Sequence, residues 1–267
     1  MAQLPRNHAD LWLRTFVPRP DARVRLVCFP YAGGGATAYK EWADLLPSSV
    51  ELVAVQYPGR QDRFDEPPLS DMVTLVDRIV PVILTCFDKP VAFFGHSMGA
   101  TVAFEVAHRL RPRYPSPLMR LFVSARRAPS DPSSKPLSFV SDEEVLAYMR
   151  ALGGSGVGLL EDRDLKELLL PMMRSDFGMV ANYRYAPGAP LTCPITAISG
   201  SRDTGFTLSH AQRWSDHTVA GFDAHSLPGG HFYTESVPEQ LTKLLTERLG
   251  ITALAGAARR ETQEVET

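Results

Sequence analysis

The sequence has few cysteines, almost no net charge and no long apolar run. Three cysteines, Cys28, Cys86 and Cys193, are too few and too scattered for a disulfide framework or for the paired spacing of a zinc site. Twenty-eight basic residues against 30 acidic ones leave a formal charge of −2, so no global charge favours nucleic acid or an anionic membrane. No stretch approaches the roughly 18 apolar residues of a transmembrane helix. We therefore expect a cytoplasmic protein with reduced cysteines, no bound metal, and no nucleic-acid or membrane partner.

What is present is the pattern of an ordinary globular chain of 267 residues, 44% of them apolar. Short runs of branched apolar residues are nearly continuous rather than alternating, which is typical of strands buried on both faces of a parallel sheet. Helical patterns separate several of them, notably at 69–84, 101–110 and 237–249. The sequence therefore predicts an α/β fold, a mostly parallel central sheet flanked by helices. The predicted strands are Arg25–Phe29, Glu51–Gln56, Val91–Phe94, Leu121–Ser124, Ile195–Ser199 and Ala224–Leu227.

The alternation of strands and helices stops between about residues 130 and 190. A capping-box pattern at Ser141 opens a predicted helix to about Leu152, and a Leu/Met-rich helical stretch follows, with Pro171 as an expected break or kink. We interpret 130–190 as a helical insertion over one end of the sheet, although ordinary packing helices fit the periodicity equally well. A single domain is predicted for 1–250, followed by a flexible tail at 251–267.

One motif carries the chemistry. Gly95-His96-Ser97-Met98-Gly99 lies between a predicted strand and a predicted helix, the setting in which G-x-S-x-G holds a nucleophilic serine at a sharp turn. The small residues on either side are needed where the chain and the helix crowd together. Ser97 is therefore the candidate nucleophile, with a plain glycine-flanked turn as the alternative.

A serine nucleophile needs a base and an acid that orients it, in the order Ser, Asp or Glu, His on this fold. Asp203 directly follows the strand at 195–199, and His231 directly follows the last apolar run. Asp216 and Asp223 are alternative acids. The other six histidines lie within predicted helices or strands, in the N-terminal segment or in the serine motif itself, so His231 is the expected base.

A second glycine cluster, residues 32–36, follows the first predicted strand. On a hydrolase of this type, that loop donates one backbone N–H to an oxyanion hole, and the residue after the nucleophile donates the other. This assigns the N–H groups of Met98 and Ala32, with Tyr31 as a second choice. The cluster also formally satisfies the G-x-G-x-x-A pattern of dinucleotide-binding loops, but the next strand ends in Gln56-Tyr57-Pro58 and lacks the acid that such a site needs.

Together these segments resemble a known family, the type II thioesterases that accompany polyketide synthases and nonribosomal peptide synthetases. The resemblance spans about residues 20–250, although Tyr57 and Gln61 depart from residues common in the family. It implies an α/β-hydrolase with a mobile helical lid at 130–190. It also implies an editing hydrolase that uses Ser97, His231 and Asp203 through an acyl-enzyme. The matching segments are Phe29–Gly34, Gln56–Arg63, Phe93–Ala100 and Gly229–Phe232.

The resemblance further implies the substrate and the partner. The substrate is an acyl group on the phosphopantetheine arm of an acyl or peptidyl carrier protein, so no separate cofactor is expected, and we expect a monomer. Arginines in the loops at the same sheet edge are candidates for docking an acidic carrier, with local salt bridges to Asp62, Asp65 or Asp131 as an equal alternative. Apolar residues are candidates for an acyl tunnel, although a plain core is the commoner meaning of such a stripe. The docking candidates are Arg60, Arg63, Arg126 and Arg127, and the substrate candidates are Tyr31, Met172, Met173 and Phe177.

Rival functions on the same scaffold are a chain-releasing, cyclising thioesterase and a small-molecule carboxylesterase. A releasing domain normally ends a multidomain chain, and the start at Met1 favours a stand-alone editor. A third alternative is a non-catalytic binding protein, which the filled triad positions disfavour.

Overall fold

The central feature of the fold is one seven-stranded sheet in the order β1-β3-β2-β4-β5-β6-β7. The computed structural model describes residues 8–110, 118–132, 139 and 141–251. Neighbouring strands are parallel except β1, which pairs antiparallel with β3. The mostly parallel sheet predicted from the sequence is therefore confirmed. Its strands are β1 Leu13–Arg14, β2 Val24–Phe29, β3 Val50–Val55, β4 Val91–His96, β5 Leu118–Ser124, β6 Ile195–Gly200 and β7 Phe222–Leu227.

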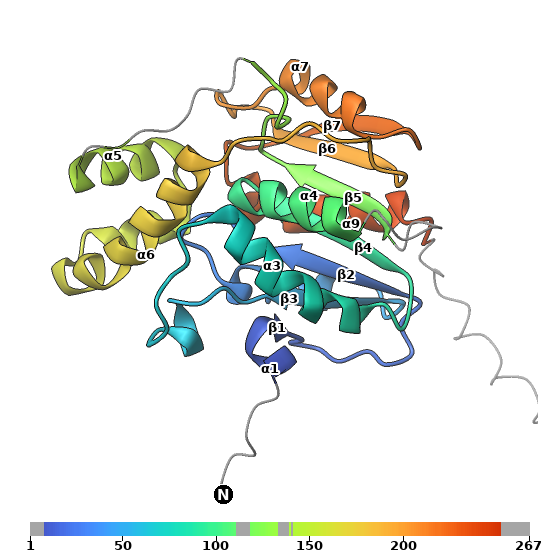
Figure 1. Cartoon of the computed structure of the whole chain (residues 1–267), viewed down its shortest axis with the longest axis horizontal. Coiled ribbons are helices and arrows are strands. Elements are labelled where there is room, and N and C mark those ends of the chain that lie inside the picture. The colour runs from blue at the N-terminus through green and yellow to red at the C-terminus, as the bar shows by residue number, and fades with distance from the viewer. Residues whose placement is uncertain (1–7, 111–117, 133–138, 140, 252–267) are drawn as a thin grey trace, which may run out of the picture.

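Helices cover both faces of this sheet, with α3 and α4 in front of it and α9 behind it in Figure 1. Alternate residues of the central strands enter two separate cores, which explains why these strands are apolar almost throughout. In β4, Phe93 packs in the core with α1, α3 and α4, whereas Phe94 packs in the core with α2, α8 and α9. The helices and 3-10 turns outside the segment between β5 and β6 are α1 His8–Trp12, η1 Ala36–Tyr39, α2 Trp42–Leu45, η2 Gln61–Arg63, α3 Met72–Ile83, η3 Leu84–Cys86, α4 Met98–Leu110, α7 Leu208–Ala211, η5 Gln212–His217, α8 Tyr233–Ser236 and α9 Pro238–Arg248.

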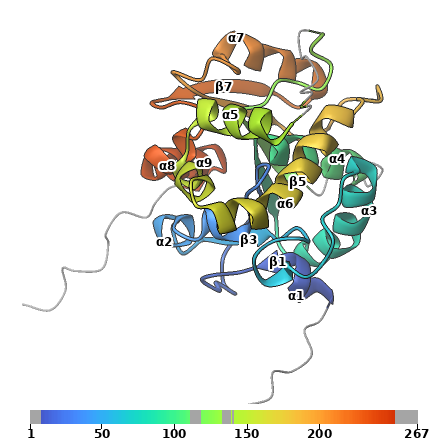
Figure 2. The ribbon, with the colours of Figure 1, turned by 90° about the vertical axis from the view of Figure 1, so that its left-hand side faces the viewer.

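The segment between β5 and β6 contains α5 Asp142–Leu152, η4 Ser155–Leu160 and α6 Arg163–Asn182, which we call the helical insertion. Figures 1 and 2 show α5 and α6 together beyond one end of the sheet. The Ser141 side chain caps α5, and Gly153 ends it at a positive φ of 77°. The expected break at Pro171 is wrong, because α6 runs through it. Pro171 is exposed, so water can satisfy the carbonyl that its missing N–H leaves free.

Two further features bear on the class of protein. All three cysteines are buried and unpaired. Among the helices of the described residues, none is both long and apolar enough to cross a membrane. Of the tail predicted at 251–267, residues 252–267 lie outside the described residues, and Ile251 is buried.

Candidate active site

Ser97 lies in the tight turn between β4 and α4, at a positive φ of 54° that residues other than glycine rarely adopt. Its N–H donates to the Ser124 carbonyl of the adjacent strand at 2.8 Å, which fixes the turn. The flanking glycines are required by contact. A Cβ on Gly95 would lie 2.2 Å from the Gly99 carbonyl oxygen, and one on Gly99 would lie 2.0 Å from the Phe29 carbonyl oxygen. The turn thus presents Ser97 at the carboxyl end of the central strand.

Two backbone N–H groups flank this serine. Met98 is the first residue of α4, and Ala32 lies in the loop after β2, where Gly33 has a φ of 81°. Within the described residues, neither the Met98 nor the Ala32 N–H donates to another protein group. Both residues line the same cavity as Ser97. The first turn of a helix and a glycine-rich strand-end loop therefore offer two free donors beside one hydroxyl group.

Asp203 and His231 meet at the ends of β6 and β7. The two loops are joined by backbone hydrogen bonds, with the Arg202 N–H donating to the Gly229 carbonyl at 2.8 Å. The His231 Nδ1 lies 2.9 Å from Asp203 Oδ2, and the N–H groups of Gly205 and Phe206 donate to Oδ1 at 2.9 and 3.2 Å. Because the carboxylate accepts from Nδ1, the Nε2 atom is left as a proton acceptor.

The ionisation of Asp203 follows from this network. Burial alone would raise its pKa, but the hydrogen bond and charge of His231 and the two backbone donors outweigh burial and hold the pKa below its usual range. The His231 Nε2 is buried and has no hydrogen-bond partner among the described residues. His231 and Ser97 line one cavity of about 390 Å³. A fixed carboxylate therefore orients an imidazole whose second nitrogen is unoccupied and shares a cavity with the serine.

The alternative acids are engaged elsewhere. Asp223 accepts hydrogen bonds from Thr196 at 2.7 Å and Arg120 at 3.2 Å, and it pairs with His225 and Arg248. Asp216 is exposed on η5. Among the three candidates, the structure brings only Asp203 to His231.

A second cavity of about 280 Å³ lies under the helical insertion. Tyr31, Ala32, Met149 and Phe232 line both cavities and so form the wall between them. The other walls of the second cavity include apolar side chains of α6 and the glycine-rich turn that opens η4. The Ala32 N–H thus belongs to a residue where the two chambers meet, and the Met98 N–H to a residue of the Ser97 cavity, which suits a substrate that extends in two directions from one reacting carbonyl.

A family described as the thioesterase domain matches residues 24–249. The chain belongs to the thioesterase family. It is 39% identical over 261 residues to "Thioesterase PikA5" of Streptomyces venezuelae, covering 97% of this chain and 93% of that protein. Its structure resembles the type II thioesterase BorB from the borrelidin biosynthetic cluster (TM-score 0.82, 40% identity, 91% and 100% covered). It also resembles YbtT, a type II thioesterase from the yersiniabactin NRPS/PKS pathway (TM-score 0.80, 27% identity, 90% and 98% covered).

These matches confirm the resemblance to type II thioesterases, the α/β-hydrolase fold and the expected enzyme class, a hydrolase of thioester bonds. The expectations of a monomer and of a reaction without cofactor or metal stay predictions.

The thioesterase departs from the sequence-based expectation at two arginines. Arg60 and Arg63 were expected on a docking rim, but only 4% and 5% of their surfaces are exposed. Arg60 pairs with Asp176 at 2.7 Å, and Arg63 pairs with Glu66 at 2.6 Å. The docking assignment of both is therefore wrong, because burial takes their guanidinium groups away from any carrier surface.

The other two arginines do reach the active-site cavity of the thioesterase. Arg126 and Arg127 are half-buried and line the same cavity as Ser97. Arg127 pairs with Asp131 at 3.5 Å, the kind of local salt bridge considered as the alternative. Arg126 donates its Nε–H to Thr101 Oγ1 at 3.0 Å, and burial lowers the pKa of its guanidinium.

The predicted substrate residues of the thioesterase divide between the two chambers. Phe177 lines the Ser97 cavity, Met172 and Met173 line the second cavity, and Tyr31 lines both. The Tyr31 hydroxyl lies 3.4 Å from the Glu235 carboxylate, and burial first, then Glu235, raises its pKa to about 12. The core alternative also applies to Met172, Met173 and Phe177, since each is buried in the larger core cluster.

Sequence reasoning missed Asp176, which is 1% exposed on α6. A signal for it was present: the carboxylate lies one turn after Met172 and Met173 and directly before Phe177, in the middle of the apolar face of the helix. A charge on a buried helical face needs a partner, and Arg60 supplies it.

Proposed function

We propose that the protein hydrolyses acyl groups from the phosphopantetheine arm of acyl or peptidyl carrier proteins, as an editing enzyme of a polyketide or nonribosomal peptide synthase. The observation that carries the proposal is the oriented Asp203–His231 pair: His231 has no protein partner for its Nε2 among the described residues and lines the same cavity as the strained Ser97. The description of YbtT as an NRPS/PKS type II thioesterase supports the choice of substrate class.

In the proposed acylation step, His231 Nε2 takes the proton of Ser97 Oγ as this oxygen attacks the thioester carbonyl. The N–H groups of Met98 and Ala32 hold the oxyanion, and each such donor typically contributes about 10²–10³ to the rate. The carbon–sulfur bond then breaks, and the sulfur leaves as the phosphopantetheine thiol with the proton that His231 had taken, which returns the imidazole to its neutral form. Asp203 keeps the imidazole in the required tautomer and stabilises its charged form.

In the second step, His231 activates water, which attacks the acyl-Ser97 ester and releases the free acid. The pKa of a thiol is about 8.5, so the sulfur leaves with less need for protonation than an amine would. No hydrogen bond joins His231 Nε2 to Ser97 in the structure, and hydrogen bonds between catalytic groups commonly tighten as substrate binds. The acyl chain and the arm would occupy the two chambers that meet at Tyr31 and Ala32.

The test uses acetyl-, butyryl- and malonyl-carrier proteins beside a p-nitrophenyl ester, with the mass of the carrier as the readout. The wild type should remove the acyl mass, and Ser97→Ala should lower kcat by about 10⁵–10⁶-fold. A Ser97→Ala variant that keeps more than a tenth of wild-type hydrolysis would contradict the assignment. Hydrolysis of the ester alone would identify a carboxylesterase, and failure of Ser97 to react with a fluorophosphonate would indicate a non-catalytic protein.

Carrier recognition is proposed for the arginines at the active-site cavity. Arg126 forms no ion pair with a described residue, so its charge is available to an anionic group of the carrier or its arm. Arg126→Gln should raise KM for an acyl-carrier substrate about tenfold, the worth of about 1.4 kcal/mol. The same variant should leave KM for a small acyl-cysteamine thioester unchanged. Equal effects on both substrates would refute recognition of the carrier by Arg126, and the same pair of measurements on Arg127→Gln tests its neighbour.

A further inference from the structure

A buried carboxylate in the helical insertion contacts the loop that carries an oxyanion donor. Asp176 lies in the middle of α6 and is 1% exposed. Its Oδ2 accepts the Gly33 N–H at 2.8 Å and the Arg60 Nη1 at 2.7 Å, while its Oδ1 accepts the Arg60 Nη2 at 2.8 Å. Asp176 therefore combines a two-pronged ion pair with a hydrogen bond to a backbone group.

That backbone group is next to the proposed oxyanion donor, because Gly33 directly follows Ala32. The ion pair holds the loop at a second point, since Arg60 Nη1 also donates to the Gly34 carbonyl at 2.9 Å. Gly33 has a φ of 81°, and a Cβ built on it would lie 3.4 Å from the Met173 side chain of α6. These contacts hold the two residues that follow Ala32, and the Gly34 N–H in turn donates at 2.9 Å to the Tyr31 carbonyl, which belongs to the same peptide group as the Ala32 N–H.

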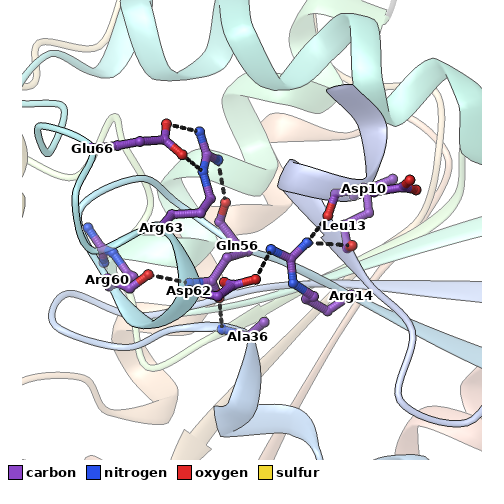
Figure 3. Close-up of polar contacts among 9 residues, drawn as sticks. All are labelled: Asp10, Leu13, Arg14, Ala36, Gln56, Arg60, Asp62, Arg63 and Glu66. Carbon is purple, nitrogen blue, oxygen red and sulfur yellow. Dashed lines mark hydrogen bonds and ion pairs between the residues drawn. The ribbon is translucent and has the colours of Figure 1, made fainter. Parts of the chain in front are cut away.

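The backbone of the arginine is hydrogen-bonded to Gln56, as Figure 3 shows. The buried amide of Gln56, directly after β3, donates to the Arg60 carbonyl at 2.9 Å and accepts the Ala36 N–H at 2.8 Å. The Arg63 Nη1 donates to the Gln56 carbonyl at 2.9 Å. These bonds connect the Arg60 backbone to the residue that follows β3, and the Arg60 guanidinium is held by the carbonyls of Gly34 at 2.9 Å and Pro58 at 3.3 Å, so Asp176 pairs with a buried and multiply bonded arginine.

The charges fit the same role. A lone carboxylate beside the loop that carries the Ala32 N–H would repel the negative charge that develops on the substrate oxygen. The paired Arg60 offsets that charge while leaving the carboxylate free to accept the Gly33 N–H. An ion pair serves here where a single carboxylate would not.

We propose that Asp176 is a positioning residue: through Gly33 and Arg60 it holds the Ala32 N–H in the direction needed for the oxyanion, so that the helical insertion completes the oxyanion hole. This inference rests on the proposed function.

The experiment compares Asp176→Ala and Asp176→Asn with the wild type, with active sites counted by complete Ser97 phosphonylation. Both variants leave Arg60 unpaired, but only asparagine retains an acceptor for the Gly33 N–H. Asp176→Ala should lower kcat by about 10–10²-fold, which is less than the rate loss expected when an oxyanion donor is removed completely. Its KM should change by less than about threefold. Asp176→Asn should lose less kcat, although both variants lose stability to a similar extent.

A second readout separates positioning from a merely structural role. The inhibition constant of an acyl trifluoromethyl ketone, which forms an oxyanion on Ser97, should rise in parallel with the loss of kcat. The affinity of an unreactive thioether analogue should not change. The matched control is Arg174→Gln, at a residue that lies on α6 as Asp176 does. This variant breaks the exposed ion pair between Arg174 and Asp142 of α5, and it should alter neither kcat nor the ketone inhibition constant.

A kcat of Asp176→Ala within threefold of wild type, or an unchanged ketone inhibition constant, would overturn the inference. If Asp176→Ala does not fold, Asp176→Asn decides the question through its smaller effect: its kcat should fall and its ketone inhibition constant rise by the same factor, and any other outcome would overturn the inference. A wild type without activity on acyl-carrier proteins would instead refute the proposed function. In that case the rates of Ser97 phosphonylation still compare the variants, and equal rates would refute the positioning role.

Discussion

Replacing Ser97 by glycine and by alanine should reverse the usual order of stability of these two residues. At an ordinary position a protein with glycine is less stable than one with alanine by about 0.4–1 kcal/mol, because the unfolded chain has more conformational freedom to lose on folding when the residue is glycine. At the φ of 54° observed for Ser97, any residue with a Cβ costs about 1–2 kcal/mol. The difference leaves Ser97→Gly more stable than Ser97→Ala by about 0.8 kcal/mol.

The assay is urea unfolding followed by tryptophan fluorescence, with both variants free of the hydroxyl and therefore matched in activity. Gly178→Ala is the control, since Gly178 lies within α6 and nothing lies within 4 Å of a Cβ built on it. At this helical position alanine should be the more stable residue by about 1 kcal/mol. A Ser97→Gly variant that is less stable than Ser97→Ala would show that the turn is not strained.

Three further outcomes follow from the site. Gly99→Ala should lower the free energy of unfolding by more than about 3 kcal/mol and abolish hydrolysis, because the new Cβ would lie 2.0 Å from the Phe29 carbonyl oxygen. Urea unfolding measures the loss of stability. Asp203→Asn should lower kcat about 10⁴-fold in steady-state kinetics with the fold intact, since the imidazole loses its tautomer. Burial, then His231, lowers the pKa of His96 well below its usual value, so its contribution to stability is present above about pH 6.5 and lost below it. Unfolding free energy should fall by up to about 1.4 kcal/mol per pH unit from this group, and less steeply in His96→Gln.

The sheet and the serine turn could be predicted because local sequence determines them. Strands such as β4 must be apolar on both sides when helices cover both faces, and the turn at Ser97 requires glycine on either side whatever lies elsewhere in the chain. The positions of Asp203 and His231 follow from strand order alone. The strand β1 was missed because two residues are too few to show a period.

The arginines could not be predicted, because the partner of a charge depends on contacts distant in sequence. Arg60 is exposed or buried according to where α6 lies, and its partner Asp176 is 116 positions away. The residues around Arg60 in the sequence do not indicate which distant carboxylate will pair with it. The apolar face of α6 did contain the clue, since a carboxylate among methionines and phenylalanine has to be neutralised by something.

The three buried cysteines have a consequence for an enzyme that handles thioesters. A protein thiolate could itself accept the acyl group by exchange with the carrier thiol and divert it from Ser97. Burial raises the pKa of Cys28 well above its usual value, that of Cys86 to about 11 and that of Cys193 to about 12. At neutral pH the thiols of Cys86 and Cys193 are therefore almost entirely protonated, and burial favours the protonated form of Cys28 as well. The fold thus keeps its own sulfur chemistry from competing with the reaction that its serine performs.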